Sequence, residues 1–361
     1  MSNKLNKKMK NLLTFLGMLA FLGLSQVVNA QQKFNVQNGA KTEFYNDIET
    51  AIEQAQAGDT VYLPAGLIQL QNDLVIDKRL SLVGVGWDIN TLQTTFPTEI
   101  NKIITFTENA NGSLLTGCKI NGNIYLGNSS AVQDIKLIRN QIIGAVCYIY
   151  IYAGSSNISI RENYIYLRTG NQQFNISANP ASTSNLPHNC FIENNIFSCG
   201  GTALILSIKN SYVINNVFDA SFGLNDNSYN IKTNYTIVQN NYIRNTITYF
   251  PSLYAGENNI FNNNAFGNDV TFPGGSNTGV DNLMNQAFDD TFESGTYHVK
   301  ATSLCKNAGT DGTDIGIYGG VFPYKDGSIP FNPHIRPNSI ATQTDSEGKL
   351  QINITITAQE R

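Results

Sequence analysis

The chain repeats one short pattern: an alternating apolar strand, then Asn, one further residue and an apolar residue. The pattern occurs at residues 135–142, 158–165, 190–197, 211–218 and 236–243, with a looser copy at 263–266. The aligned residues are Asn140, Asn163, Asn195, Asn216, Asn241 and Asn264, separated by 23, 32, 21, 25 and 23 residues. A period near 23 with one insertion is typical of a solenoid in which each repeat forms one coil.

Two apolar columns accompany the Asn residues. The position three residues before each Asn holds Leu137, Ile160, Ile192, Val213 and Val238, and the position two residues after it holds Ile142, Ile165, Phe197, Phe218 and Ile243. No coil can bury these side chains alone, so stacking must form the core. The aligned Asn is expected at a corner, because Asn tolerates left-handed backbone angles. Its amide can bond the same amide one coil away, at a spacing of about 4.8 Å.

Both ends of the repeat array carry candidate caps. Residues 47–55 are typical of a short amphipathic helix that could cover the first coil. Residues 350–356 alternate like a half-buried strand, after the segment Pro330–Pro337 and a turn at Asp345–Gly348. That strand is expected either to fold back along the solenoid, covering an exposed edge, or to pair with a partner molecule.

The first 30 residues have the features of an export signal. Lys4, Lys7, Lys8 and Lys10 precede an apolar run at Leu12–Leu24, and Val28, Asn29 and Ala30 suit a cleavage site before Gln31. The run, of about thirteen residues, is short for a membrane span. We therefore expect residues 1–30 to be a signal peptide, and the mature chain to be exported to the periplasm, the cell surface or the medium.

Charge and cysteine content exclude several classes of function. Without the four signal Lys, 19 basic residues face 27 acidic ones, a net charge of −8, and no basic cluster follows residue 30. Nucleic acid and anionic membranes are therefore not expected as partners. The five Cys lack the CxxC spacing of zinc sites. Cys190 and Cys199 either pair across one coil or serve, like the others, as small buried residues.

Segments outside the repeat carry a family resemblance. Residues Ala57–Gly66, Leu74–Asp77 and Leu80–Gly86 resemble the first coils of the pectate-lyase-like right-handed parallel β-helix superfamily, and Asn307–Gly320 is similar to the closing coil of secreted bacterial members of Bacteroidetes type. The resemblance implies an all-β, right-handed parallel β-helix over residues 31–325, with an N-terminal helical cap. Residues 326–361 would form a C-terminal extension with a capping strand.

The motifs of the well-known enzymes in that superfamily are missing. The three His lie at positions 188, 298 and 334, none in a Gly-His-Gly, and the one Asp-Asp pair, at 289–290, lies outside the regular coils. A calcium-dependent lyase would carry a cluster of Asp residues beside an Arg, and no such cluster is visible in the sequence. No pectin-esterase signature is present either. Because fold does not imply function, the activity stays open.

One group of charged residues is a candidate catalytic site. With Leu137, Ile160 and Ile192 inward, alternation places Lys136, Arg161 and Glu193 on the outside of one sheet, with Arg139 and Glu162 at the following corner. A cation beside a carboxylate could neutralise a uronate and abstract its proton. Alternatively, Arg161 and Glu193 form an ordinary surface ion pair.

A second group is aromatic. With Ile149 and Ile151 inward, Tyr148, Tyr150 and Tyr152 face outward, and Tyr164 and Tyr166 flank Ile165 in the same way. Outward Tyr rings suit sugar rings, whereas the opposite register would bury them in the core.

The sequence indicates no metal site and no cofactor. Asp311 and Asp314 could bind calcium, but Asp-Gly is also ordinary turn chemistry. The leading hypothesis is an exported β-helix that binds polysaccharide or another surface polymer along its side. The alternatives are a diverged polysaccharide lyase or glycoside hydrolase, and an adhesin or assembly component.

Overall fold

The structure is a computed structural model. It describes residues 32–88, 96–144, 148–167, 174–179, 185–199, 204–220, 231–244, 254–269, 276–329, 331, 334–335, 343–353 and 356–357. The expected signal peptide, residues 1–30, lies outside the described residues. Within the described ranges, no helix has the length and apolar character needed to cross a membrane.

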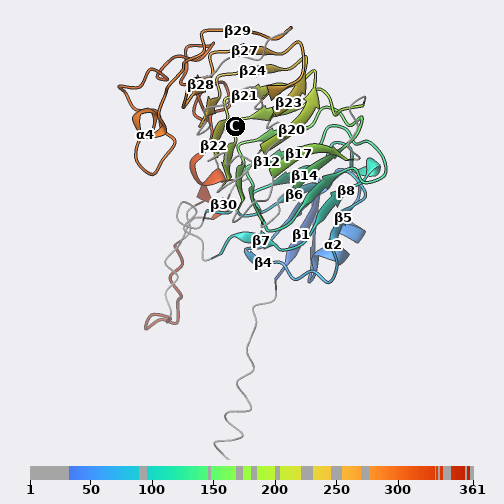
Figure 1. The fold of residues 1–361 in the computed structure, drawn as a ribbon. Coiled ribbons are helices and arrows are strands. Elements are labelled where there is room, and N and C mark those ends of the chain that lie inside the picture. The colour runs from blue at the N-terminus through green and yellow to red at the C-terminus, as the bar shows by residue number, and fades with distance from the viewer. Residues whose placement is uncertain are drawn as a thin grey trace, which may run out of the picture. The chain divides into compact units, whose positions relative to one another are not determined.

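Between residues 60 and 280, the described residues form three parallel sheets, here named A, B and C, which the chain enters in the repeated order A, B, C (Figure 1). Sheet A contains β3 (Thr60–Tyr62), β6 (Ser81–Val83), β9 (Leu114–Thr116), β12 (Lys136–Ile138), β15 (Ser159–Arg161), β18 (Phe191–Glu193), β21 (Tyr212–Ile214), β24 (Ile237–Gln239), β27 (Ile260–Asn262) and β29 (Thr278–Val280). Sheet B contains β4 (Gly66–Leu67), β7 (Thr98–Ile100), β10 (Lys119–Ile120), β13 (Gln141–Gly144), β16 (Tyr164–Leu167), β19 (Ile196–Cys199), β22 (Val217–Ala220), β25 (Tyr242–Ile243) and β28 (Ala265–Phe266). Sheet C contains β5 (Leu74–Ile76), β8 (Ile104–Phe106), β11 (Ile124–Leu126), β14 (Tyr148–Tyr152), β17 (Phe174–Asn179), β20 (Leu204–Lys209), β23 (Ile231–Asn234) and β26 (Tyr254–Ala255). The predicted right-handed parallel β-helix is confirmed.

The first coil is capped as expected. An antiparallel hairpin, β1 (Phe34–Asn38) and β2 (Lys41–Tyr45), extends sheet A beyond β3. Helix α2 (Ile48–Gln54) follows, and the Asp47 side chain accepts a hydrogen bond from the Thr50 amide at its N-terminus. Ile48, Ala51 and Ile52 are the buried residues of α2, so the apolar face of this short helix packs inward, as the sequence pattern predicts.

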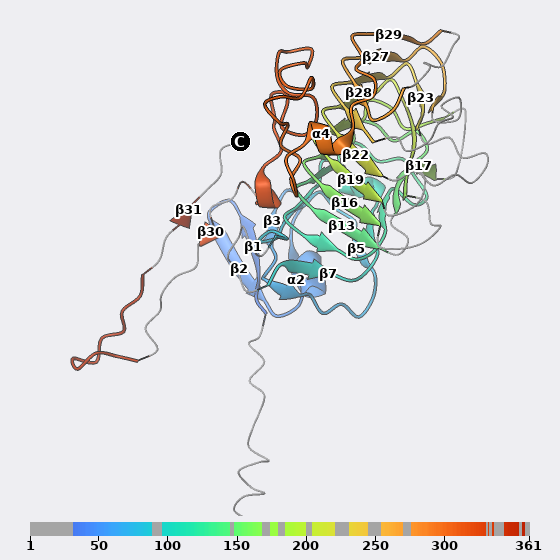
Figure 2. The same ribbon diagram turned by 60° about the vertical axis from the view of Figure 1, so that its left-hand side comes forward.

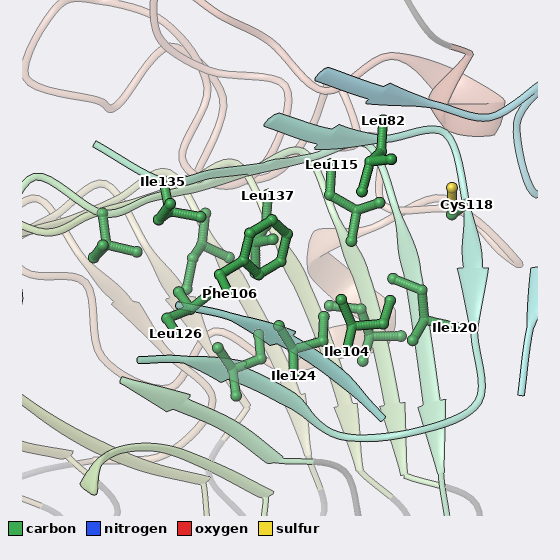
Figure 3. Close-up of a cluster of buried hydrophobic side chains, with 14 of the residues drawn as sticks. Leu82, Ile104, Phe106, Leu115, Cys118, Ile120, Ile124, Leu126, Ile135 and Leu137 are labelled. Carbon is green, nitrogen blue, oxygen red and sulfur yellow. The ribbon is translucent and has the colours of Figure 1, made fainter. Parts of the chain in front are cut away.

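The core lies between the sheets. Every member of the two predicted apolar columns is at most 1 % exposed. Sheet C closes the core with pairs such as Ile104 and Phe106 or Ile124 and Leu126, and Figure 3 shows these side chains meeting Leu115 and Leu137 of sheet A. Cys118 and Cys190 are free, buried thiols in the same core, so Cys190 forms no disulfide.

A column of buried amides runs along the corner between sheets A and B. Each Asn side chain donates to the amide oxygen of the Asn in the next coil, as from Asn163 to Asn195 (3.0 Å) and from Asn195 to Asn216 (3.0 Å). The left-handed residue of the corner is the one before the aligned Asn, with φ near 55° at Arg139, Glu162, Asn194, Asn215, Asn240 and Asn263. The aligned Asn was the residue expected to have left-handed angles, and that expectation is wrong by one position.

The chain returns along the outside of the β-helix after β29. Asn263 donates to the Ala308 carbonyl, Asn194 to those of Ile317 and Gly319, and Arg139 to that of Ile329. Segment 283–329 therefore passes over several coils in the reverse direction, through the short helices α4 (Phe288–Thr291) and η3 (Asp326–Ser328) (Figure 2). Between β8 and β9 lies a third short helix, η1 (Glu108–Ala110).

This return corrects the expectation that residues 307–320 form the closing coil. Ile315 and Ile317 are fully buried, but against Val217 and Tyr242 on the outer face of sheet B, where they form a second apolar cluster. Near the C-terminus, β31 (Ile356–Thr357) pairs antiparallel with β30 (His334–Ile335) of the same chain, while Leu350 and Ile352 are exposed.

Candidate functional site

The outer face of sheet C carries aromatic side chains. Ile149 and Ile151 are fully buried, so Tyr150 and Tyr152 of β14 face outward and are half-buried. Tyr150 is in register with Tyr125 of β11, and the two rings stack with centroids 4.9 Å apart and planes 16° apart. The side chain of Tyr148, the third residue predicted in this row, lies outside the described residues.

Tyr125 was not among the predicted binding residues. It extends the row because its neighbours, Ile124 and Leu126, are fully buried. The signal was present in the sequence, since Asn-Ile-Tyr-Leu at 123–126 alternates in the same way as the Tyr-rich strand one coil later.

Tyr164 and Tyr166 lie on a different sheet. They belong to β16 of sheet B. The Tyr164 ring stacks with Trp87 and with Tyr166, at centroid distances of 5.5 Å and 6.2 Å. The returning segment packs against Tyr164 as part of the second apolar cluster. The five predicted Tyr residues therefore do not form one platform.

The charged candidates lie on and beside sheet A. Arg161 and Glu193 are in register on β15 and β18, with Nε and Oε2 2.6 Å apart. Lys136 is exposed and lies in the other outward row of the sheet, in register with Ser159 and Phe191. The structure thus joins Arg161 to Glu193 and leaves Lys136 apart.

Arg139 is buried below the surface of the corner. Its guanidinium contacts Glu162 (2.7 Å), donates to the Ile329 carbonyl (2.8 Å) and lies 3.8 Å from the centre of the Phe331 ring. Arg139 is 1 % exposed, so a polymer on the surface cannot reach it in this conformation. The contacts with Ile329 and Phe331 show that Arg139 holds the returning segment against the corner.

A cavity of about 370 Å³ opens beside these residues. Its lining consists of Ile138, Arg139, Arg161, Glu162, Val321, Phe322, Pro323, Lys325 and Phe331. The five residues between 321 and 331 were not predicted as site residues, because no local pattern shows that this segment returns to sheet A.

Burial affects the acid of the Arg161–Glu193 pair. Removal from water raises the pKa of Glu193, and the adjacent Arg161 opposes that rise with a smaller effect. A raised folded-state pKa means that the folded protein holds this proton more tightly than the unfolded chain. The resulting stabilisation is complete below the ordinary pKa of Glu, about 4.3, and is lost as the pH rises through the raised pKa.

Glu193→Gln tests this effect. The free energy of unfolding of the variant minus that of the wild type is expected to become more positive between about pH 4 and pH 7, because the variant lacks the pH-dependent loss. Urea unfolding at several pH values measures the difference. Glu347→Gln removes the same charge from an exposed position and is the matched control. A difference that stays constant or falls with pH would contradict the raised pKa.

The acidic residues near residue 311 form turn contacts. Asp311 accepts hydrogen bonds from the amide and hydroxyl of Thr313, and Asp314 contacts Lys306 (2.7 Å) and the Asn307 amide (2.9 Å). In the part of the chain that the structure describes, no group of three or more His, Cys, Asp or Glu could hold a metal ion.

Comparison with known proteins gives no family. No family model matches the chain, and no curated protein matches it. Two solved structures of the catalytic domain of a GH87 alpha-1,3-glucanase, one with nigerose and one, a D1069A variant, with tetrasaccharides, have TM-scores of 0.33 and 0.27 at 11% and 12% identity. These matches cover 70% and 63% of this chain, and the chain spans 56% and 52% of those domains. With TM-scores this low, neither similarity bears on the fold or the function of this chain.

Proposed function

We propose that this chain is an exported protein that binds a polysaccharide along the outer face of sheet C. The observation that carries the proposal is the stacked pair of Tyr125 and Tyr150, which lie in register on neighbouring coils and face outward. The basic and apolar segments before residue 31 support export.

The physical basis is the match between an uncharged aromatic surface and a sugar. The stacked rings of Tyr125 and Tyr150 turn their faces toward each other, so they offer a polymer their apolar ring edges and hydroxyls that can bond to the sugar hydroxyls. In register with these rings lie Thr105 and Val75, so this row of four residues carries no charge. In a solenoid, the residues of such a row follow one another at the spacing of the coils. This arrangement suits a polymer rather than a single sugar.

The polymer is expected to have neutral sugars at the Tyr row. The row itself is uncharged, and the mature chain, if cleaved before Gln31, has a net charge of −8, which repels a polyanion at low ionic strength. This expectation separates the row on sheet C from the cationic cavity beside sheet A.

Binding of the purified protein to a panel of neutral and acidic polysaccharides, measured by affinity electrophoresis, tests the proposal. Tyr150→Ala and Tyr125→Ala are each expected to weaken binding about fivefold, because each removes one aromatic ring worth about 1 kcal/mol. Tyr150→Phe keeps the ring and should retain most of the affinity. Reducing-end release from the same polymers shows whether binding is accompanied by cleavage.

Tyr212→Ala is the matched control. Tyr212 stacks on Phe191 across neighbouring coils in the same way, with centroids 5.2 Å apart, but on sheet A. An equal loss of affinity in this control would show that the effect is not specific to sheet C. Unchanged affinity in Tyr125→Ala and Tyr150→Ala, or no binding of any polymer, would contradict the proposal.

A further inference from the structure

The cavity beside sheet A is formed by three parts of the chain that are distant in sequence. Ile138 and Arg161 come from the outer face of the sheet, Arg139 and Glu162 from the corner, and the remaining lining residues from 321–331. Its volume, about 370 Å³, is at the lower end of the range typical of small-molecule sites. The cavity therefore exists only when the returning segment is in place.

The cations of the cavity exceed the acids around it. Arg139 is neutralised by Glu162, and Arg161 by Glu193. Lys325 is the third cation of the lining; Glu162 acts on its charge from farther away, but no ion pair joins Lys325 to an acid among the described residues. The adjacent Asp326 instead contacts His298 and accepts a hydrogen bond from the Tyr318 hydroxyl. One positive charge in the cavity is therefore not balanced by an ion pair.

The remaining walls are apolar and aromatic. The Phe331 ring lies over Arg139, and the Phe322 ring lies 5.3 Å from the guanidinium carbon of Arg161. The two rings lie against the guanidinium groups, and Ile138, Val321 and Pro323 complete the apolar part of the lining. Val321 and Phe322 are 84% and 49% exposed, which is unusual for two adjacent large apolar residues and leaves apolar surface at the cavity without a protein partner.

We propose that this cavity binds a small organic acid: a carboxylate joined to an apolar, preferably aromatic, body. The carboxylate supplies a negatively charged partner for the Lys325 ammonium, and the Arg161 guanidinium offers it further hydrogen-bond donors. The body packs against Phe322 and Phe331. This site lies on a different sheet from the Tyr row and does not depend on polysaccharide binding there.

Isothermal titration calorimetry with three matched probes tests the proposal. 3-Phenylpropionate carries both the charge and the aromatic body, 3-phenylpropionamide keeps the body without the charge, and acetate keeps the charge without the body. The acid is expected to bind at least about tenfold more tightly than either of the others, because charge-assisted hydrogen bonds and ring burial act together. Equal affinity for the amide, or no binding of the acid, would overturn the proposal.

Variants locate the binding. Lys325→Met is expected to weaken binding of 3-phenylpropionate at least tenfold, while Lys325→Arg retains it in part. Lys136→Met removes the same charge from an exposed position two residues before Ile138, outside the cavity lining, and should leave binding unchanged. An equal loss in both Met variants would show that the probe responds to net charge alone. Tyr150→Ala should not alter binding of the acid, so the two sites are tested separately.

Discussion

Replacing Asn195 by Ala is expected to lower the free energy of unfolding by about 3–5 kcal/mol, because several buried polar groups lose their partners at once. Asn195 is fully buried. Its amide oxygen accepts from the backbone and side-chain amides of Asn163, and its amide nitrogen donates to Asn216 and to the Ile160 carbonyl. Alanine leaves these groups buried with no water to replace the lost hydrogen bonds.

Urea unfolding followed by circular dichroism measures this loss. Asn353→Ala is the control, because Asn353 is exposed and its replacement should change the free energy of unfolding by less than about 0.5 kcal/mol. Asn195→Asp tests the same column in another way, since a carboxylate can accept the Asn163 bonds but cannot donate to Asn216. If Asn195→Ala were as stable as the wild type, the amide column would not stabilise the fold.

The second large effect is expected at the buried pair of Arg139 and Glu162. Both residues have left-handed backbone angles, with φ of 56° and 53°, at positions where the next coils have Asn194 and Asn215. Arg139→Asn relieves backbone strain but leaves Glu162, 4 % exposed, without its cation. A broken buried pair costs about 3–5 kcal/mol, so the variant is expected to be destabilised by roughly that amount.

The double variant, Arg139→Asn with Glu162→Asn, is expected to recover much of that loss. It removes the unpaired charge and gives both corners the residue that neighbouring coils use at the same angle. Unfolding free energies of the two single variants and the double variant form a cycle whose coupling energy reports the pair. Additive losses would show that Arg139 acts through Ile329 and Phe331 alone, and that its contact with Glu162 contributes nothing.

The repeating part of the fold was predictable from the sequence. An apolar residue such as Ile160 occurs three positions before the aligned Asn in each coil. Alternation within a strand places Tyr150 outward once Ile149 and Ile151 are inward. These inferences hold because each coil contacts its neighbours at equivalent positions, so a local pattern repeated in sequence becomes a column in space.

The return of the chain was not predictable by the same reasoning. Asn194 and Asn263 bind the returning segment, but in the sequence they cannot be distinguished from the many other Asn residues near the corners. Their partners are 123 and 45 residues away, and the bond from Arg139 to Ile329 spans 190 residues. Such pairings depend on the path of an irregular segment, which has no period. For the same reason, Lys325 and Phe322 were missing from the candidate site.

The returning segment also affects how the solenoid comes apart. In a simple stack, each coil contacts only its neighbours, so terminal coils can fray while the middle stays folded. Here the returning segment is hydrogen-bonded to Asn263, Asn194 and Arg139, which lie in coils that do not touch one another. Loss of the coil that contains Asn263 is therefore expected to loosen contacts several coils away, so fraying from this end is expected to be suppressed. We expect the coils between Arg139 and Asn263 to unfold as one cooperative unit, as a globular domain does.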